Sequence, residues 1–323
     1  MLFKAKLYVL IRHADRGREF PKSMLLDPIS LQVFISAVEE GTIAKAAARE
    51  RIAPAAISRR LSELEAVLQT PLFSRSNKGL QPTTAGLTLI SLARQVLHDI
   101  DDVYAHMREF TGGTRGYIRV FANLSTITQF LPHDLQTFLT LHPDVEISLE
   151  EKISTAITKG VFENAADIGL FTQGVPSHGL RIFPYHKDEL VLVIPQKHPL
   201  AVRKSVSVKD ILDFDFVGLH AGSWMNLELT KAATTLGRTV KQRIQVTGYD
   251  ALCLMVEAGM GIGILPKNSA RTYTRSLRLR TIPLKEPWAR RQLAICVRSY
   301  EQLSVAAKLL VDHFQLSSSN DPK

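Results

Sequence analysis

The sequence predicts an α+β chain of several domains: an α-rich winged helix-turn-helix, one long helix, and then an α/β half. Three observations support this prediction. Residues 42–82 hold two short helix patterns joined by a turn, residues 87–110 form an apolar-striped run without Pro or Gly, and beyond Gly116 strand patterns alternate with helix patterns. At 323 residues the chain is long enough for two or three domains with separate cores.

The composition favours a globular protein with an anionic partner. Forty Lys and Arg against 31 Asp and Glu give a net charge of +9, and apolar residues make up 45% of the sequence. Such an excess suits nucleic acid or a membrane surface, although a merely soluble basic surface is the alternative. No stretch reaches the roughly 18 consecutive apolar residues of a membrane span, so we expect no membrane partner.

The motifs of common enzymes and metal sites are not found in the sequence. No Cys pair has metal-ligand spacing, and no His-Glu-x-x-His, Gly-x-Ser-x-Gly or Walker A pattern occurs. The glycines of residues 259–263 follow a helix pattern and run into a strand, which is the wrong order for a dinucleotide fingerprint. Cys253 and Cys296 lie in apolar runs, which predicts buried free thiols in a reducing cytoplasm. We therefore expect no enzyme, no metal and no cofactor.

Residues 1–27 do not conform to the rest of the chain, and we expect a disordered extension there. The segment is too charged around its short apolar run for a secretory signal, and no small-residue cleavage site follows. Arg12-His13 faintly resembles the signature of histidine phosphatases, but a helix-turn-helix pattern follows too soon for such a domain. The preferred interpretation is a floppy extension or an upstream start codon, with Met24 as the other candidate start.

The segment from Pro28 to Pro82 has the pattern of a winged helix-turn-helix. A first apolar-striped helix ends at Gly41, and Thr42 is a plausible N-cap for the alanine-rich helix that follows. Pro54 suits the first turn of the next helix, which has an apolar stripe on one face and polar side chains on the other. Residues 74–79 then read as a cationic hairpin tip, a wing able to reach phosphate.

This arrangement predicts binding to double-stranded DNA, with the second helix in the major groove. Ala53, Pro54, Ala55, Ser58 and Arg59 are expected near base edges, and Arg59 is the residue able to make a bidentate guanine contact. The remaining candidates, expected at phosphates, are Thr42, Lys45, Arg60, Arg75 and Lys78. For each Arg or Lys alone, a solvated basic face is the alternative.

The long helix after the wing, which Thr83 or Thr84 can cap, has a heptad-like apolar seam. Apolar residues alternate steps of four and three from Leu89 to Phe110. A helix standing between two domains can bury such a face only on a partner, so we expect a dimer; a helix buried within one domain is the alternative. The expected dimerisation residues are Leu89, Val96, Ile100, Val103 and Met107. Residues 111–116 read as a flexible hinge.

Several short motifs in register resemble one family. Ala46-Ala47, Ser58-Arg59, Leu64-Glu65, Leu72-Phe73-Ser74-Arg75 and Thr83-Thr84-Ala85-Gly86 together resemble the DNA-binding domain of LysR-type transcriptional regulators. Phe130-Leu131-Pro132, residues 166–170, Lys197-His198-Pro199-Leu200 and residues 259–266 resemble the family's two-lobed, type 2 periplasmic-binding-protein-like effector domain. Ala53, Pro54 and Ala55 depart from the usual Ser, Gln and Ser or Pro, and Glu50 stands where a leucine is common.

The resemblance implies a domain scheme and a function. The scheme is an extension at 1–27, a DNA-binding domain at 28–86, a linker helix at 87–111, an effector domain at 112–316 and a tail at 317–323. Lobe I would hold about 117–183 and 265–316, and lobe II about 184–264. The implied function is a cytoplasmic, sequence-specific transcriptional regulator, dimeric or tetrameric, that reads an interrupted palindrome, responds to a small effector and works with RNA polymerase. A solute-binding module without a transcriptional role is the alternative; it would need a signal peptide and no recognition helix.

The α/β half offers two candidate sites at helix starts, and its alternating strands and helices predict parallel sheets. Asn123-Leu124-Ser125-Thr126 follows the first strand and opens a helix, where backbone N–H groups favour an anion; an ordinary N-cap is the alternative. In relatives the effector there is often a carboxylate. His220 and Ser223 have the same setting in the opposite lobe, and His220 could add pH sensitivity. The effector candidates are Asn123, Ser125, Thr126, Thr155, Phe171, His220, Ser223 and Tyr249. We expect no arginine inside this cleft, and the effector's identity stays open.

Overall fold

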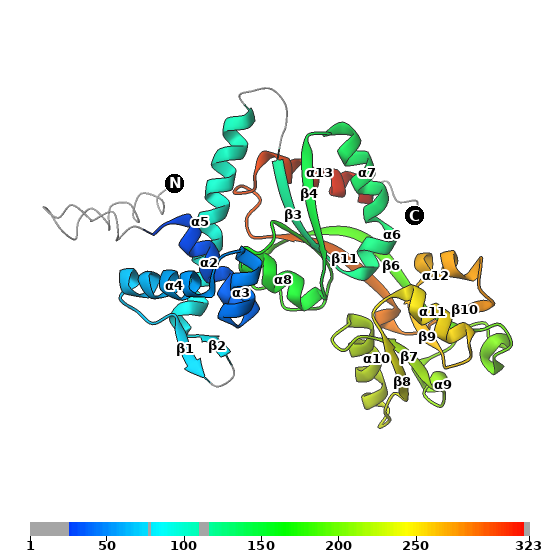
Figure 1. The fold of residues 1–323 in the computed structure, drawn as a ribbon. Helices are drawn as coiled ribbons and strands as arrows, with labels where there is room; N and C mark the ends of the chain where they lie inside the picture. Colours follow the sequence, from blue (N-terminus) through cyan, green and yellow to red (C-terminus); the bar gives the residue numbers. More distant parts are fainter. Residues whose placement is uncertain (1–25, 77–78, 110–115, 320–323) are drawn as a thin grey trace, which may run out of the picture. The chain divides into compact units, whose positions relative to one another are not determined.

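The structure, a computed structural model, describes residues 26–76, 79–109 and 116–319 (Figure 1). The chain divides into two compact units that meet between Asp101 and Asp102, and each is described by itself. Of the expected N-terminal extension, all but residues 26 and 27 lies outside the described residues. None of the described helices is both long and apolar enough to cross a membrane.

The first unit is a helical domain with a β-hairpin. Its elements are α2 (Pro28–Glu40), α3 (Ile43–Glu50), α4 (Pro54–Leu68), β1 (Phe73–Ser76), β2 (Gly79–Pro82) and the start of α5 (Thr84–Glu109). The carboxylate of Asp27 accepts a hydrogen bond from the Ser30 backbone N–H at 2.9 Å and so caps α2. Gly41 ends α2 in the left-handed region, at a φ of 67°. The two strands pair antiparallel.

The core of this unit joins all three short helices to the hairpin and to the beginning of α5. Phe34 from α2, Ile57 from α4 and Leu72 before the hairpin are buried there. Ile90 and Ala93 of α5 are buried in the same cluster, and Leu89 packs against it. Part of the apolar seam of α5 is therefore used within the unit, which is the alternative that the sequence left open for this helix.

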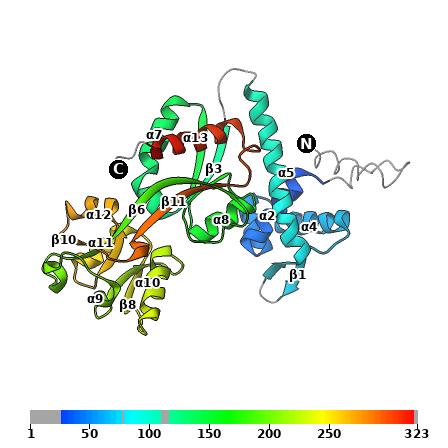
Figure 2. The same cartoon turned by 180° about the vertical axis from the view of Figure 1, so that it is seen from behind.

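The second unit contains two α/β lobes connected by two long strands, best seen from behind (Figure 2). In lobe I, β3 (Gly116–Ala122) pairs parallel with β4 (Val145–Glu151) and β5 (Ile168–Thr172). Its helices are α6 (Leu124–Gln129), α7 (Leu131–Leu141), α8 (Ser154–Phe162) and α13 (Val305–Ser319). Helix α13 continues to Ser319, so residues 317–319 of the expected tail are helical.

Lobe II is built on shorter strands. Its elements are η2 (Pro199–Val202), α9 (Val208–Ile211), β7 (Phe216–Leu219), α10 (Trp224–Thr235), β8 (Gln242–Val246), α11 (Tyr249–Glu257), β9 (Gly263–Pro266), α12 (Lys267–Thr274), β10 (Leu279–Pro283) and η3 (Pro287–Ala289). Strands β7 and β8 pair parallel. The strands that connect the lobes are β6 (Arg181–Pro195) and β11 (Arg290–Val297), which pair antiparallel.

Three features of this unit differ from the sequence-based expectation. The helix pattern after the first strand forms two helices, α6 and α7, because Pro132 lies in the first turn of α7 and cannot continue α6. The sheets are mixed, since β6 pairs antiparallel with β9, β10 and β11. Residues 265–289 pack in the core of lobe II, with Leu265, Leu279 and Ile282 buried there, so the chain returns to lobe I along β11 and not at 265.

Candidate functional site

The start of α4 presents a small, exposed surface in the first unit. Ala53 is the N-cap residue, with φ −63° and ψ 143°, and it makes no side-chain cap bond. Pro54 occupies the first helical position, where its missing N–H leaves no donor unpaired. Ala53, Pro54 and Ala55 are exposed, as are Ser58 and Arg59 one turn further on. This end of the helix therefore offers backbone, methyl groups, one hydroxyl and one guanidinium.

Arg59 extends from the outer face of α4. Its side chain is 81% exposed, and its Nε donates to Glu63 Oε1 at 2.8 Å, one turn along the helix. An exposed pair of this kind contributes little to stability, because solvent screens both charges. The guanidinium can therefore exchange Glu63 for another acceptor at little cost.

The other predicted DNA-contacting residues have mixed surroundings. Lys45 is exposed, and the Thr42 hydroxyl accepts from the Lys45 backbone N–H at 3.3 Å, capping α3. Arg60 donates to the Ser30 hydroxyl at 3.3 Å and lies 3.6 Å from Asp27 Oδ1, which ties α4 to the start of α2. Arg75 belongs to β1, but its side chain is outside the described part, and Lys78 is outside it altogether.

Two polar contacts fix the helices of this unit against each other. Glu39 accepts from Arg49 at 2.6 Å and from Arg94 at 2.6 Å, so one carboxylate joins α2, α3 and α5. Burial raises the pKa of Glu39, but the hydrogen bonds from the two arginines outweigh it and hold that pKa below its ordinary value. Glu50, at the position where the family commonly has leucine, accepts a hydrogen bond from the buried hydroxyl of Ser36. A polar pair thus joins α2 to the end of α3.

In the second unit, Asn123 organises the start of α6. Its side-chain oxygen accepts from the backbone N–H and the hydroxyl of Thr126 at 2.9 and 2.7 Å, which caps the helix. Its amide nitrogen donates to Thr172 Oγ1 at 3.0 Å and Ser154 Oγ at 3.3 Å. Asn123 is therefore a structural N-cap whose amide also positions two hydroxyls from β5 and α8.

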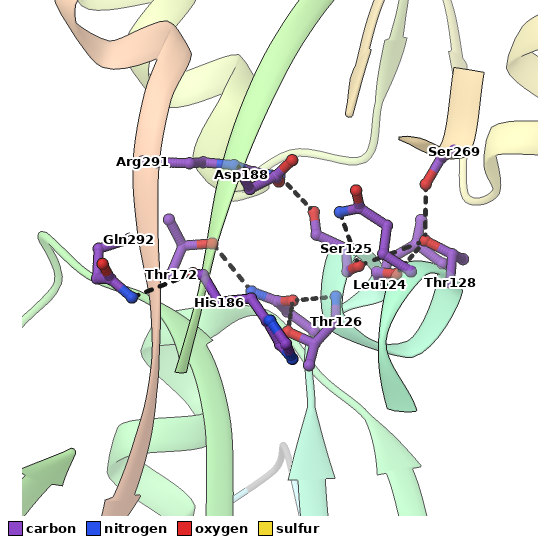
Figure 3. A network of polar contacts seen from close by, with 12 residues as sticks. Leu124, Ser125, Thr126, Thr128, Thr172, His186, Asp188, Ser269, Arg291 and Gln292 are labelled. Atoms are coloured by element: carbon purple, nitrogen blue, oxygen red, sulfur yellow. Dashed lines mark hydrogen bonds and ion pairs between the residues drawn. The ribbon is translucent and has the colours of Figure 1, made fainter. Parts of the chain in front are cut away.

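Beside it, a buried polar cluster joins both lobes (Figure 3). Ser125 of α6 lies 2.9 Å from the hydroxyl of Tyr249 in lobe II and accepts from Arg291 Nη2 at 2.7 Å. Arg291 on β11 is also paired with Asp188 on β6, and both side chains are almost completely buried. The guanidinium lies 5.4 Å from the ring centroid of Trp224, close enough for a cation–π contact. Burial raises the pKa of Tyr249 to about 12, so its hydroxyl stays protonated and can donate.

These residues surround a cavity of about 40 Å³ between the lobes. Five of the eight predicted effector residues line it: Asn123, Ser125, His220, Ser223 and Tyr249. The other three do not. Thr126 is turned toward Asn123, Phe171 is buried in the core of lobe I, and Thr155 is exposed outside the cavity.

Six polar or aromatic residues of the cavity wall were not predicted from the sequence: Glu151, Lys152, Ser154, Thr172, Trp224 and Arg291. Ser154 is next to the predicted Thr155, and Thr172 is next to the predicted Phe171. The prediction therefore named the right helix and strand but the wrong side chain on each. Arg291 contradicts the expectation that no arginine lies in the cleft. Its neighbours in the sequence gave no indication of the site, because it reaches the cavity only through the pairing of β6 with β11.

Two further observations concern cysteines and metal-ligating side chains in the described part of the chain. Both cysteines are buried and free, and burial raises the pKa of Cys253 and of Cys296 to about 12, so neither forms a thiolate near neutral pH. Among the residues that the structure describes, no group of three His, Cys, Asp or Glu side chains could hold a metal ion.

Comparison with known families identifies the class of protein. Residues 29–87 match the model described as bacterial regulatory helix-turn-helix protein, lysR family, and residues 111–317 match the LysR substrate binding domain. The chain therefore belongs to the LysR family: it is a DNA-binding transcriptional regulator with an effector-binding domain and not an enzyme.

Individual relatives are distant but cover the chain well. An uncharacterized HTH-type transcriptional regulator, YbhD of Escherichia coli (strain K12), is 25% identical over 86% of this chain and 88% of its own length. The crystal structure of full-length CbnR in complex with its target DNA is similar with a TM-score of 0.61 at 22% identity, covering 90% of this chain and 100% of that one. The effector-binding domain of QuiR in complex with shikimate gives 0.57 at 20% identity, covering 64% and 99%. The two structures support the fold.

Proposed function

We propose that α4 reads DNA bases and that a small effector, bound in the cavity between the lobes, controls how the paired helices engage their operator. The observation that carries this proposal is the buried cluster of Ser125, Tyr249 and Arg291, which takes one residue from each of three elements and lines the cavity. A ligand that replaces part of this cluster binds one arrangement of the lobes better than another, which shifts the population of arrangements. The domain boundaries predicted from the sequence fit this proposal when lobe I is taken to resume at β11 and not at residue 265.

The DNA contacts are assigned by exposure and chemistry. Arg59, with its fork of donors, reads a guanine, while Ala53, Pro54, Ala55 and Ser58 approach base edges through backbone, methyl groups and one hydroxyl. The phosphate contacts are assigned to Thr42, Lys45, Arg75 and Lys78. Arg60 contributes mainly by holding α4 on α2, through Ser30 and Asp27.

The exposed side of α5 is assigned to the dimer. Leu92, Val96 and Val103 recur at helical spacing and are 57%, 45% and 61% exposed. They continue the predicted seam beside Leu89 and Ile100, while Ala93 is already buried within the first unit. A dimer paired through this row presents two recognition helices to an interrupted palindrome, and a dimer of dimers presents four. The site of action is the cytoplasm, with RNA polymerase as a partner at the promoter.

The effector is assigned as a small polar molecule with a carboxylate. Hydroxyls of Ser125, Ser154, Thr172 and Ser223 face the cavity together with Tyr249, and Arg291 supplies the positive charge that a carboxylate needs. Because Asp188 already pairs with Arg291, a second carboxylate gains mainly hydrogen bonds and only part of a charge pair. The cavity of about 40 Å³ is smaller than the roughly 300–1,000 Å³ of typical ligand sites, so the lobes must separate to admit the effector.

The test is a screen of small carboxylates by thermal shift of the full-length protein, followed by titration of each compound that stabilises it. We expect Ser125→Ala to weaken binding at least tenfold, since the variant removes the hydroxyl that contacts both Tyr249 and Arg291 in the cavity wall. Thr155→Ala is the matched control, because Thr155 is exposed outside the cavity. Equal binding by the wild type and Ser125→Ala would place the effector elsewhere.

A further inference from the structure

We propose a second ligand site, on the other face of the two strands that connect the lobes, for a small organic dianion such as a phosphate monoester or a dicarboxylate. The site is an open groove with a volume of about 850 Å³, lined by parts of β6, β11 and α12. It shares Arg291 with the effector cavity, and its other lining residues and its charge are different.

The groove follows from the alternation of side chains along the paired strands. Asp188 and Arg291 are directly opposite each other and are turned into the protein, where they meet Ser125 and Trp224. Successive residues of a strand point to opposite faces, so Lys187, Glu189 and Arg290 are turned the other way. The structure has all three in the groove wall.

Helix α12 provides the other wall. Lys267 and Arg271 are four residues apart, on one face of this helix, and both line the groove. Lys267 Nζ lies 2.7 Å from Glu189 Oε2, which holds the start of α12 against β6. No side chain caps α12 at Pro266, so the backbone N–H groups of its first turn add a partial positive charge.

The charges in the groove do not balance. Glu189 neutralises Lys267, and Asp188 neutralises Arg291. Lys187, Arg271 and Arg290 are exposed, and none of their side chains has a hydrogen-bond or ion-pair partner among the described residues. Three unpaired cations around one concave surface complement an anion with more than one charge, and two of them are arginines, whose planar fork matches carboxylate and phosphate oxygens.

The place of the groove suggests what its ligand does. β6 and β11 are the strands that pass from one lobe to the other, and α12 packs in the core of lobe II through Ala270. A dianion held between Arg290 and Arg271 links a connecting strand to that lobe. It therefore favours one lobe arrangement and changes the affinity of the effector cavity for its own ligand, and the reverse holds equally.

The test is calorimetric titration of the full-length protein with two probes, inorganic phosphate and succinate, at constant ionic strength set with chloride. We expect at least one probe to bind with a dissociation constant of about 1 mM or tighter. The double variant Arg271→Gln/Arg290→Gln should weaken that binding at least tenfold. The double variant Arg275→Gln/Arg280→Gln removes the same charge from exposed positions of the same lobe outside the groove, and it should bind like the wild type.

The outcomes separate the possible sources of binding. Preference for phosphate identifies a phosphate monoester as the ligand class, and preference for succinate identifies a dicarboxylate. Equal losses in both double variants would mean that net charge alone attracts the probe, and this would overturn the site. So would unchanged binding by Arg271→Gln/Arg290→Gln, or no binding by the wild type to either probe. Binding that Ser125→Ala abolishes would assign the probe to the effector cavity instead.

Discussion

The ion pair between Arg291 and Asp188 is the most buried charged contact of the effector unit. The two side chains are 3% and 2% exposed, and the guanidinium also donates to Ser125. Such a pair contributes little net stability against apolar residues of similar size, because both charges lose their hydration. Breaking it is different, because one charge stays buried without its partner.

We therefore expect Asp188→Ala to destabilise the effector unit by about 3–5 kcal/mol. Asp188→Ala/Arg291→Met should recover much of this loss, since it removes the orphaned guanidinium as well. Urea unfolding of the full chain, followed by tryptophan fluorescence, measures both variants, because Trp224 and Trp288 both belong to this unit. The loss of unfolding free energy in the double variant could equal the sum of the losses in Asp188→Ala and Arg291→Met. In that case the pair would not act as a coupled unit.

In the proposed function, Arg59 is the residue on which sequence reading by α4 depends. We expect Arg59→Ala to weaken specific DNA binding by about 1–3 kcal/mol and to relax the preference at one base position. Lys45→Ala, which removes an exposed cation from the neighbouring helix, should weaken binding to all sequences alike and reduce its salt dependence. Binding of both variants to an operator and to scrambled DNA at several salt concentrations distinguishes the two effects. An unchanged specificity ratio in Arg59→Ala would contradict the role given to this helix face.

At the scale of elements, α5 has two apolar surfaces with different uses. Ile90 and Ala93 are buried in the first unit, and Leu89 packs beside them. Leu92, Val96 and Val103 are exposed on a neighbouring face. The predicted seam thus combined an intramolecular contact with an exposed apolar row, because a helical period alone does not say which part of a helix is covered within its own unit.

The exposed row predicts the result of a single charge substitution. We expect Val96→Glu to raise the dissociation constant of the dimer by about 100-fold or more, because a carboxylate in an apolar seam is buried without a partner. Ser91→Glu is the control, since Ser91 lies on a different side of the helix from Val96. Sedimentation velocity over a range of protein concentrations measures both. A dimer that survives Val96→Glu with unchanged affinity would require another interface.

Local patterns predicted most elements, and long-range pairing explains the errors. The caps at Thr42, Asn123 and Ser223 and the glycine at Gly41 were readable because each acts within a few residues of itself. The first half of β6 is not readable as a strand in the sequence, since Pro184, Lys187 and Asp188 interrupt its apolar pattern. That strand is held by its partner β11, about a hundred residues away, and the same pairing brings Arg291 to the cavity.

As a whole molecule, the chain joins a DNA-binding domain to an effector-binding domain. The family match covers both units, so the class of regulator is established. We further propose that α4 supplies the specificity and that paired subunits present two copies of α4. Both proposals can be tested by the DNA sequence that the protein selects.

The most direct measurement is selection of bound sequences from a random DNA library by the purified full-length protein, repeated at several salt concentrations. The account predicts an enriched interrupted palindrome whose half-site centres are about 10 base pairs apart or a multiple of that, with affinity that falls steeply as salt rises. The same selection with Arg59→Ala should lose the preference at one position of each half-site. Salt-dependent binding without any enriched sequence, or a single unpaired half-site, would contradict the account.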